Sequence, residues 1–560
     1  MKRMAYIAVF FIFATFMAAG CGGSNSTGSS EIIPAERRTD WKPGLLVHQS
    51  AYPVFANVKN PPYSAAGNDV SDDTQAIQNA IDDCPPGSAV FLPEGTYRVS
   101  DALNISKGIV LRGEGPQKTR IRNYKNSSGN IILIRGSGSS SGSISITGGH
   151  NKGSSQISVA STANLDIGDY VRMFQDNDPV LVDIGGCNWC GDSGQHVLAQ
   201  IAQIQGISGN TVTLNRPLYH TFSASLNPEL KTLSMVEGAG IENLYIEKVN
   251  GGGSYSSTNN IQARQSANSW IRNIESVNAV GAHIRMESSY ANEIRDSYFH
   301  HGHSYGSGRA YGVFLYNRNS DILVENNTFY YLRHSMVLES GGSGNVFGYN
   351  YSRRMFGDTD PADTNWLMAD LSSHGAHPFM NLFEGNSAQH LGPDYTWGSA
   401  SHMTYFRNHI IRENQGVNQM ASYHLIAVDI QSKNYYMNLV GNIFCKDDSC
   451  SGNYEAGFTD SSSDKVIYRL GYSSDGSHTL SDPLVADTLL RHGNFDFITD
   501  TTEWDPSITD HNLPNSLYLT SKPTFFGVKS WPVYGPDLDP MVGVLPAEER
   551  FILGGGSDDI

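Results

Sequence analysis

Residues 383–408, FEGNSAQHLGPDYTWGSASHMTYFRN, contain a loop rich in groups that bind, stack or transfer protons. Asp394, His402 and Arg407 could hold hydroxyl or carboxylate groups, whereas Tyr395 and Trp397 could stack on sugar rings. For Trp397, packing in a core is the alternative. We therefore treat Asp394 and His402 as candidate catalytic residues and the other three as candidate substrate contacts.

A second group of candidates lies in the stretches HHGHSYGSGRAY and YYLRHS. His303 and His334 each follow a polar residue, Asp296 or Asn327, by seven positions, so equal turn lengths would stack them on adjacent coils. Histidine is suited to proton transfer near neutral pH, and arginine to holding a carboxylate. A ladder of structural histidines is the alternative. The candidates here are His303, Arg309, Arg333 and His334 for catalysis and Tyr311 for substrate binding.

The third group lies in GDTDPADTNWLMADLSSHGAHPFMNLFEGN, residues 357–386. Asp358, Asp360 and Asp363 could bind Ca²⁺ in a turn, because hard cations favour clustered oxygen ligands. The spacing matches an EF-hand poorly, and a solvated acidic turn is the alternative. The other candidates are Asp370, His374 and Glu384 for catalysis and His377 for substrate binding.

A repeated phrase must position these groups. Short β-like runs each contain one Asn or Asp, and these polar residues recur 22 to 36 positions apart. A single coil cannot bury its apolar face, so such repeats stack into a solenoid with a continuous core. Asn suits the turn because it tolerates left-handed backbone and can hydrogen-bond a neighbouring coil. The repeated residues are Asn243, Asn273, Asp296, Asn327, Asn350, Asn386, Asn408 and Asn442.

Segments outside the repeat predict caps and an insert. A helix after Asp72 or Asp73 would place Ile77 and Ile81 on one apolar face. Alternation of apolar and polar residues around Gly turns predicts a small antiparallel β insert. We expect a signal peptide at 1–20, a tether and linker at 21–66, an N-terminal cap and first coils at 67–149, the insert at 150–225, β-helix coils at 226–480, and a C-terminal cap and tail at 481–560.

The N-terminus and the cysteines predict export. MAAGC, at the end of an apolar run, resembles the lipobox of bacterial lipoproteins, which implies lipidation of Cys21 and an anchor in the outer membrane or at the cell surface. Secretion with cleavage nearby is the alternative. Cys445 and Cys450 predict a disulfide, and CNWC, with Cys187 and Cys190, predicts a second disulfide, a metal site or a redox pair.

The phrases RHSMVLESGGSGNVFGYNYS, HGAHPFMNLFEGN and DYTWGSASHMTYFRN resemble exported bacterial proteins of the pectate-lyase superfamily. This resemblance implies an all-β, right-handed parallel β-helix with an N-terminal capping helix, similar to polysaccharide lyases or to glycosyl hydrolases of family 28. The polygalacturonase pattern of NTD, DD, GHG and RIK is not reproduced. No catalytic residue is therefore transferred from the family.

The expected function is cleavage of a polysaccharide, which could contain uronate, with a lyase favoured over a hydrolase because basic residues outnumber paired acids in the candidate groups. The alternative is a non-catalytic surface protein that binds glycan or matrix. A net charge of −17 argues against nucleic-acid binding. We expect a monomer, in contact with a membrane only through its lipid anchor, with Ca²⁺ as the one conceivable cofactor.

Overall fold

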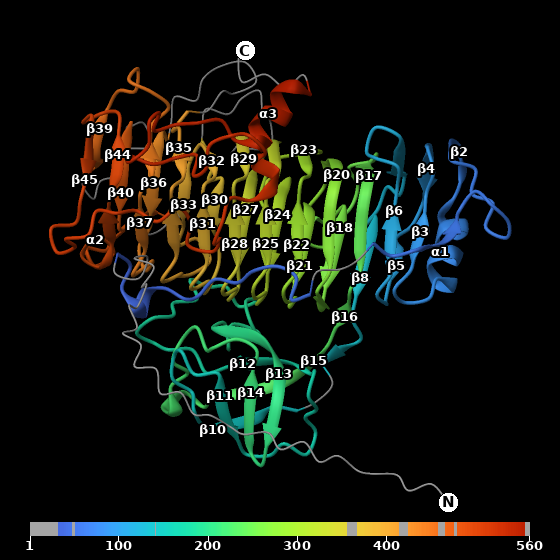
Figure 1. Ribbon diagram of the computed structural model, residues 1–560, viewed down its shortest axis with the longest axis horizontal. Coiled ribbons are helices and arrows are strands. Elements are labelled where there is room, and N and C mark those ends of the chain that lie inside the picture. The colour runs from blue at the N-terminus through green and yellow to red at the C-terminus, as the bar shows by residue number, and fades with distance from the viewer. Residues whose placement is uncertain are drawn as a thin grey trace, which may run out of the picture.

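The computed structural model describes residues 32–47, 51–139, 142–355, 367–413, 424–456, 465–474 and 479–554. Parallel strands stack in chain order along the long axis, and an antiparallel sheet lies against the middle of this stack (Figure 1). The predicted parallel β-helix with its antiparallel insert is thus confirmed. Within the described residues, no helix is long and apolar enough to cross a membrane.

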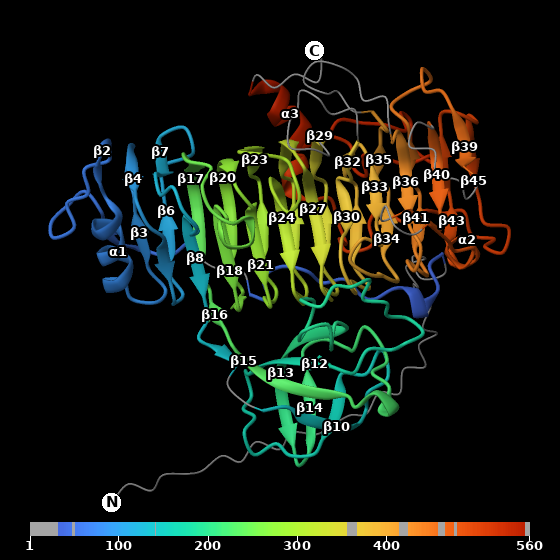
Figure 2. The same ribbon diagram turned by 180° about the vertical axis from the view of Figure 1, so that it is seen from behind.

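The strands of successive coils form three parallel rows. Figure 2 shows the solenoid from behind. Row 1 consists of β1 (Val54–Asn57), β3 (Ala89–Phe91), β6 (Val110–Arg112), β17 (Gly240–Lys248), β20 (Trp270–Ala279), β22 (Glu293–Arg295), β25 (Leu323–Glu325), β28 (Val346–Gly348), β31 (Leu382–Glu384), β34 (Thr404–Phe406), β37 (Asn438–Val440) and β43 (Leu490–His492). Row 2 consists of β2 (Asn68–Asp72), β4 (Gly95–Val99), β7 (Thr119–Asn123), the later parts of β17 and β20, β23 (Tyr298–Gly302), β26 (Thr328–Leu332), β29 (Tyr351–Met355), β32 (Ser387–Ala388), β35 (His409–Ile410), β38 (Ile443–Phe444) and β44 (Asn494–Asp496), with β45 (Thr501–Glu503) antiparallel at its end.

Row 3 consists of β5 (Leu103–Ile105), β8 (Ile132–Arg135), β18 (Ile261–Arg264), β21 (Ala282–Glu287), β24 (Tyr311–Tyr316), β27 (His334–Glu339), β30 (Leu371–Ser373), β33 (Leu391–Pro393), β36 (Ile426–Ile430), β40 (Val466–Leu470) and β39 (Asn453–Ala456). Apolar side chains from all three rows form one core inside the coils. The rings of Phe347, Phe383 and Tyr405 stack there, with centroids 4.9 and 5.2 Å apart. The helices are α1 (Thr74–Asp83), which covers the first coil, α2 (Leu484–Thr488) and α3 (Pro546–Leu553). Two short pairs complete the strands: β16 (Val236–Glu237) with β19 (Ser266–Ala267), and β41 (Tyr472–Ser474) with β42 (Thr479–Ser481).

The corner between rows 1 and 2 explains the repeated Asn. Asn243, Asn273 and Asp296 have left-handed backbone at this corner. In the next coil, Asn326 has the same left-handed backbone. The next position along the chain points inward, and from Asn327 onward it forms a buried ladder in which each backbone N–H and side-chain Nδ2 donates to the Oδ1 of the next member. The ladder members are Asn327, Asn350, Asn386, Asn408, Asn442 and Asn494. The predicted residues therefore all lie at this corner. Asn243, Asn273 and Asp296 hold its left-handed position, whereas the later ones, from Asn327 onward, hold the inward position that follows it.

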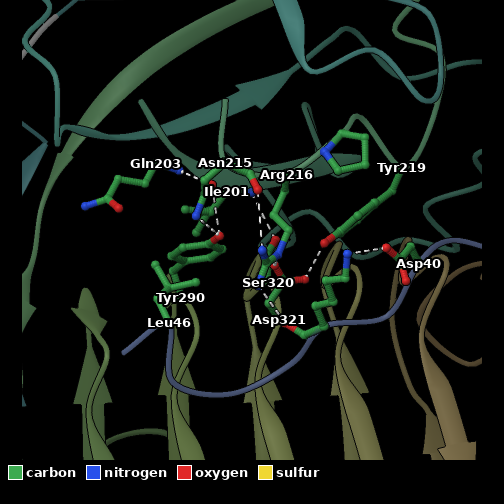
Figure 3. A network of polar contacts seen from close by, with 12 residues as sticks. Asp40, Leu46, Ile201, Gln203, Asn215, Arg216, Tyr219, Tyr290, Ser320 and Asp321 are labelled. Atoms are coloured by element: carbon green, nitrogen blue, oxygen red, sulfur yellow. Dashed lines mark hydrogen bonds and ion pairs between the residues drawn. The ribbon is translucent and has the colours of Figure 1, made fainter. Parts of the chain in front are cut away.

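The antiparallel insert contains β9 (Gly138–Ser139), β10 (Ile144–Gly148), β11 (Gln156–Val159), β14 (Thr211–Leu214), β13 (Ala199–Ser208), β12 (Tyr170–Phe174) and β15 (Glu229–Ser234). A polar network joins it to the solenoid (Figure 3). Arg216 Nε and the Tyr219 hydroxyl donate to the buried Asp321 carboxylate, at 3.1 and 2.6 Å. Because these groups are removed from water, each needs its partner, and the insert is held at one orientation.

The first and last segments that the structure describes run along the solenoid. Residues 32–47, predicted as part of a linker, lie across several coils, where the Trp41 indole donates to Met380 O at 2.9 Å and Gly44 N donates to Asp321 O at 2.8 Å. Residues 504–554 run back along row 1 and row 2, so they do more than cover the last coil. Arg407, on β34's corner, binds Asp537 of this tail with both Nη atoms at 2.7 Å.

We predict that Asn386→Ala lowers the free energy of unfolding by about 2–4 kcal/mol, because the neighbouring ladder groups lose their partners without access to water. Asn386 Nδ2 donates to Phe347 O and Asn408 Oδ1, both at 2.9 Å, and its Oδ1 accepts from Asn350. Urea denaturation followed by circular dichroism measures the change. Asn151→Ala, at an exposed turn of the insert, is the control, and equal stability of the two variants would contradict the role of the ladder.

Candidate functional site

A groove with a volume of about 880 Å³ runs along the outer face of row 3. It receives side chains from the successive strands β21 to β40, from the loops that follow them, and from the insert. Its charged and imidazole groups are Arg285, Arg333, His334, Glu339, His374, His390, Asp394, His424, Asp429 and Arg469. Its aromatic groups are Trp189, Tyr255, Tyr311, Phe314, Tyr316, Trp397 and Tyr472. A groove with aromatic walls and convergent polar groups is the usual form of a ligand site.

Strand register brings Glu339, His374 and Asp394 together. Leu338, Ser373 and Pro393 are aligned on β27, β30 and β33, and the three polar residues each follow one of them in the chain. His374 Nδ1 donates to Asp394 Oδ2 at 2.6 Å, and the His374 side chain is 17% exposed to the groove. Burial alone would lower the pKa of His374, but the Asp394 and Glu339 carboxylates outweigh burial and raise it above its usual value. These two carboxylates therefore favour the protonated form of His374.

His334 shows the opposite behaviour. Its Nδ1 lies 2.8 Å from the Ala369 carbonyl and must donate to it, which leaves Nε2 as the acceptor atom. Nε2 is buried and has no hydrogen-bond partner within the described residues. Burial and the nearby Arg333 and His374 lower the pKa of His334 well below its usual value, so this imidazole is neutral. The rings of His334 and His374 lie 5.9 Å apart.

Glu339 is linked to the insert. The Trp189 indole donates to Glu339 Oε1 at 3.2 Å and packs edge-on against Trp397, with ring centroids 4.6 Å apart. Burial raises the pKa of Glu339, and this effect exceeds that of His374 and Trp189, which lower it. Trp189 belongs to CNWC, in which Cys187 and Cys190 form a disulfide, as Cys445 and Cys450 do. Both predicted disulfides are confirmed. Because Cys187 and Cys190 are joined in a disulfide, their sulfur atoms are not available as thiolate ligands for a metal.

The groove arginines differ in their pairing. Arg469 binds Asp429 through Nε and Nη2, at 2.9 and 2.7 Å. Arg333 Nη1 donates to Tyr305 O and Arg285 Nη1 to Ser256 O, and neither arginine forms an ion pair with a described residue. Two positive charges in the groove thus lack a carboxylate partner within the described part of the chain, which would suit an anionic ligand despite the negative charge of the whole protein.

Six of the residues predicted as a site meet in this groove: Tyr311, Arg333, His334, His374, Asp394 and Trp397. The expected stack of His303 on His334 does not form, because Tyr311 is the residue aligned with His334. His303 Nε2 instead lies 2.8 Å from Lys248 O, and Arg309 lies over the ring of Tyr255. The turn after β23 is longer than the turn after β26. His303 and His334 therefore occupy different positions in their coils, although each lies seven residues after a repeated polar residue.

Other predicted residues lie away from the groove lining. Asp370 is buried and accepts hydrogen bonds from Ser352 Oγ and from the backbone of Gln389 and His390. Glu384 accepts from Tyr349 and from Leu517 N of the tail. Further structural contacts involve His377 with Ser399 and Ser401, His402 with Ser401, Tyr395 N with Gln431, and Arg407 with Asp537. Asp358, Asp360, Asp363 and Cys21 fall outside the described residues.

Sequence reasoning missed Glu339, Arg285, Trp189 and the Asp429–Arg469 pair. Glu339 is the last residue of β27, the strand that begins with His334. Side chains of a strand alternate between two faces, so Glu339 lies on the face opposite to the inward Leu338. This alternation is the signal that could have identified Glu339. Trp189 comes from the insert, and no repeat spacing relates it to row 3. Asp429 and Arg469 are aligned on β36 and β40, although 40 positions separate them in the sequence.

A family model described as rhamnogalacturonase A/epimerase, pectate lyase-like, matches residues 55–189 and so includes Trp189 but no other residue of the groove. No curated protein sequence matches the chain. The tailspike gp61 of Pseudomonas phage phi297 is similar in structure, with 14% identity over 74% of this chain and 69% of that one and a TM-score of 0.51. That likeness shows a common fold.

Two further structures resemble the chain more weakly. The tailspike protein gp49 of Pseudomonas phage LKA1 shares 17% identity over 71% of this chain and 66% of that one, with a TM-score of 0.48, so the match spans just under two thirds of the tailspike. The mannuronan C-5 epimerase AlgE6 A-module of Azotobacter vinelandii shares 14% identity over 79% and 93%, with a TM-score of 0.39.

We predict that Asp394→Asn lowers the pKa of His374, because the substitution removes the carboxylate that holds the imidazolium while burial continues to oppose its charge. NMR titration of ¹³C-labelled histidine, with the His374 signal assigned by its loss in His374→Gln, measures the shift. Glu275→Gln removes the carboxylate beside His300 on another row and should leave the His374 titration unchanged. An unchanged pKa in Asp394→Asn would refute the pairing.

Proposed function

We propose that the groove of row 3 cleaves a polysaccharide by β-elimination next to a uronate carboxylate. The observation that supports this most directly is the opposite behaviour of His334 and His374, neighbours whose environments drive their pKa values apart. Such a pair supplies a base and an acid to one reaction. The family match, described as pectate lyase-like, agrees with an enzyme that acts on polysaccharides.

The proposed reaction assigns one role to each group. His334 Nε2 takes the proton from C5 of the uronate, and the electron pair released forms the C4–C5 double bond as the bond from C4 to the glycosidic oxygen breaks. The His374 imidazolium gives its proton to that oxygen. Asp394 positions the imidazolium by accepting a hydrogen bond from His374 Nδ1. Arg333 neutralises the carboxylate, whose charge otherwise opposes loss of the neighbouring proton. Trp397 and Tyr311 would contact the sugar rings.

Hydrolysis is the second candidate, and Glu339 favours it. A carboxyl group with a raised pKa can protonate a leaving group, while Asp394 is a carboxylate two strands away in row 3. Two strand spacings of about 4.8 Å place such groups near the upper end of the roughly 6.5–9.5 Å used by inverting glycosidases. Convergence of these groups in one groove argues against the non-catalytic alternative, in which binding groups would be spread along the solenoid.

We further propose that the protein is exported and lipid-anchored through Cys21, with the solenoid facing a polysaccharide outside the cytoplasm. The apolar run that ends in MAAGC supports this. Metabolic labelling with a fatty-acid analogue should mark the wild-type protein and leave Cys21→Ser unmarked. Labelling of Cys21→Ser would refute the lipidation site.

We predict that the purified protein, incubated with uronate-containing polymers, produces absorbance near 235 nm together with new reducing ends, because elimination forms an unsaturated uronate. The same polymers with and without Ca²⁺, and a panel of neutral polymers, are run in parallel. Reducing ends without absorbance would establish hydrolysis and direct attention to Glu339. Binding to a polymer without either product would favour the non-catalytic alternative.

We predict that His374→Gln lowers kcat by about 10²–10⁴-fold. In the wild type, activity should fall as the pH rises through the raised pKa of His374, because the acid loses its proton, and Asp394→Asn should move this alkaline limb to lower pH. A pH–rate profile of kcat measures both effects. An unmoved alkaline limb in Asp394→Asn would contradict the assignment of His374 as the acid.

We predict that Arg333→Gln reduces kcat/KM on uronate polymers by about 10- to 100-fold, the size of one lost charged hydrogen-bond pair. Arg120→Gln, at an exposed position on β7, is the matched control and should retain wild-type kinetics. If Arg333→Gln keeps wild-type kcat/KM, this arginine does not neutralise the substrate carboxylate.

A further inference from the structure

A second pocket, with a volume of about 290 Å³, lies between row 2 and the C-terminal tail. Residues on and beside β29, β32, β35 and β38 form its floor, and Tyr534, Val542 and Glu548 of the tail form its wall. It shares no lining residue with the groove of row 3. Its volume is at the lower end of ligand pockets and would hold about one sugar residue.

The pocket contains a buried arginine with two guanidinium nitrogens that lack a hydrogen-bond partner among the described residues. Arg354 is 6% exposed, and its Nε and Nη2 atoms have no hydrogen-bond partner among the described residues. Its charged end lies 5.3 Å from the centre of the Tyr330 ring, which orients the guanidinium without neutralising it. Arg354 has left-handed backbone near the end of β29, at the position that His301 and Tyr331 hold near the ends of β23 and β26, so the backbone of the solenoid places it there.

The acidic residues of the pocket are already engaged. Glu413 pairs with Lys446 at 3.5 Å, Asp447 accepts from Ser449 N at 3.0 Å, and Glu548 accepts from Leu545 N at 3.3 Å. None of them has an ion pair with Arg354 in the described structure. A buried charge without a counter-charge is strongly unfavourable, so the pocket is arranged for an anion that is not part of the described chain.

We propose that this pocket binds a small monocarboxylate with hydroxyl groups, such as a uronic acid residue. The planar fork of Arg354 matches a carboxylate, with which it can form two parallel hydrogen bonds. The neighbouring acids would accept hydrogen bonds from hydroxyl groups and would repel a doubly charged phosphate or sulfate. This inference does not depend on the reaction proposed for the groove, because the two sites share no residue.

The test is isothermal titration calorimetry with D-galacturonate and D-glucuronate on the full chain. Wild-type protein and the control variant Arg120→Gln, at an exposed position on β7, should bind with the same affinity, whereas Arg354→Met should bind about 10- to 100-fold more weakly. Loss of binding in Arg333→Met with retention in Arg354→Met would place the ligand in the groove and overturn the proposal. Equal binding of glucose, or tighter binding of inorganic phosphate, would overturn the ligand class.

A second variant guards against misfolding. Arg354→Lys keeps the charge but loses the planar fork, so it should weaken binding while leaving thermal unfolding close to that of the wild type. Arg354→Met should unfold at a temperature equal to or above that of the ligand-free wild type, because it removes a buried unpaired charge. A marked fall in the unfolding temperature of Arg354→Met, together with unweakened binding in Arg354→Lys, would show that Arg354 has a structural role only.

Discussion

The buried asparagine ladder is the interaction on which the rest of the structure depends. Each ladder residue bonds the backbone and side chain of its neighbour one coil away, so the relative position of successive coils is set at each turn from Asn327 to Asn494. A slip of one residue would turn the inward and outward faces of the strands around. Because register is maintained at this corner, residues of β27, β30 and β33 that are distant in sequence are aligned on row 3.

That alignment brings polar residues from distant parts of the sequence together in the candidate site. His334 and His374 have the same side chain, yet burial lowers the pKa of His334, whereas Asp394 and Glu339 raise the pKa of His374. The difference arises from neighbours one strand away, at the spacing of a parallel sheet. The parallel strands thus bring two histidines with opposite pKa shifts into one groove.

The segments that cover the solenoid contribute to both proposed sites. The insert, held by Asp321 against Arg216 and Tyr219, delivers Trp189 to Glu339 at the groove. The C-terminal tail, held by the pair of Arg407 and Asp537, forms the wall of the pocket around Arg354. A β-helix exposes long flat faces, and covering segments convert parts of these faces into enclosed, partly desolvated sites where charge interactions are stronger.

The sequence by itself determined the solenoid, its capping helix, the antiparallel insert and the Cys445–Cys450 disulfide, because apolar periodicity, recurring Asn and close cysteine pairs are local signals. For CNWC it left a disulfide, a metal site and a redox pair open, and the structure decided for the disulfide. It also indicated some of the stretches that supply the groove, those around His334, His374 and Asp394. Only the tertiary structure decided which side chains face that groove. Because turn lengths differ between coils, Tyr311 and not His303 is aligned with His334. Asp370 and Glu384 instead form hydrogen bonds within structural networks. Partners such as Trp189 for Glu339 come from segments 150 residues apart, and no local pattern encodes a contact made by two separately folded surfaces.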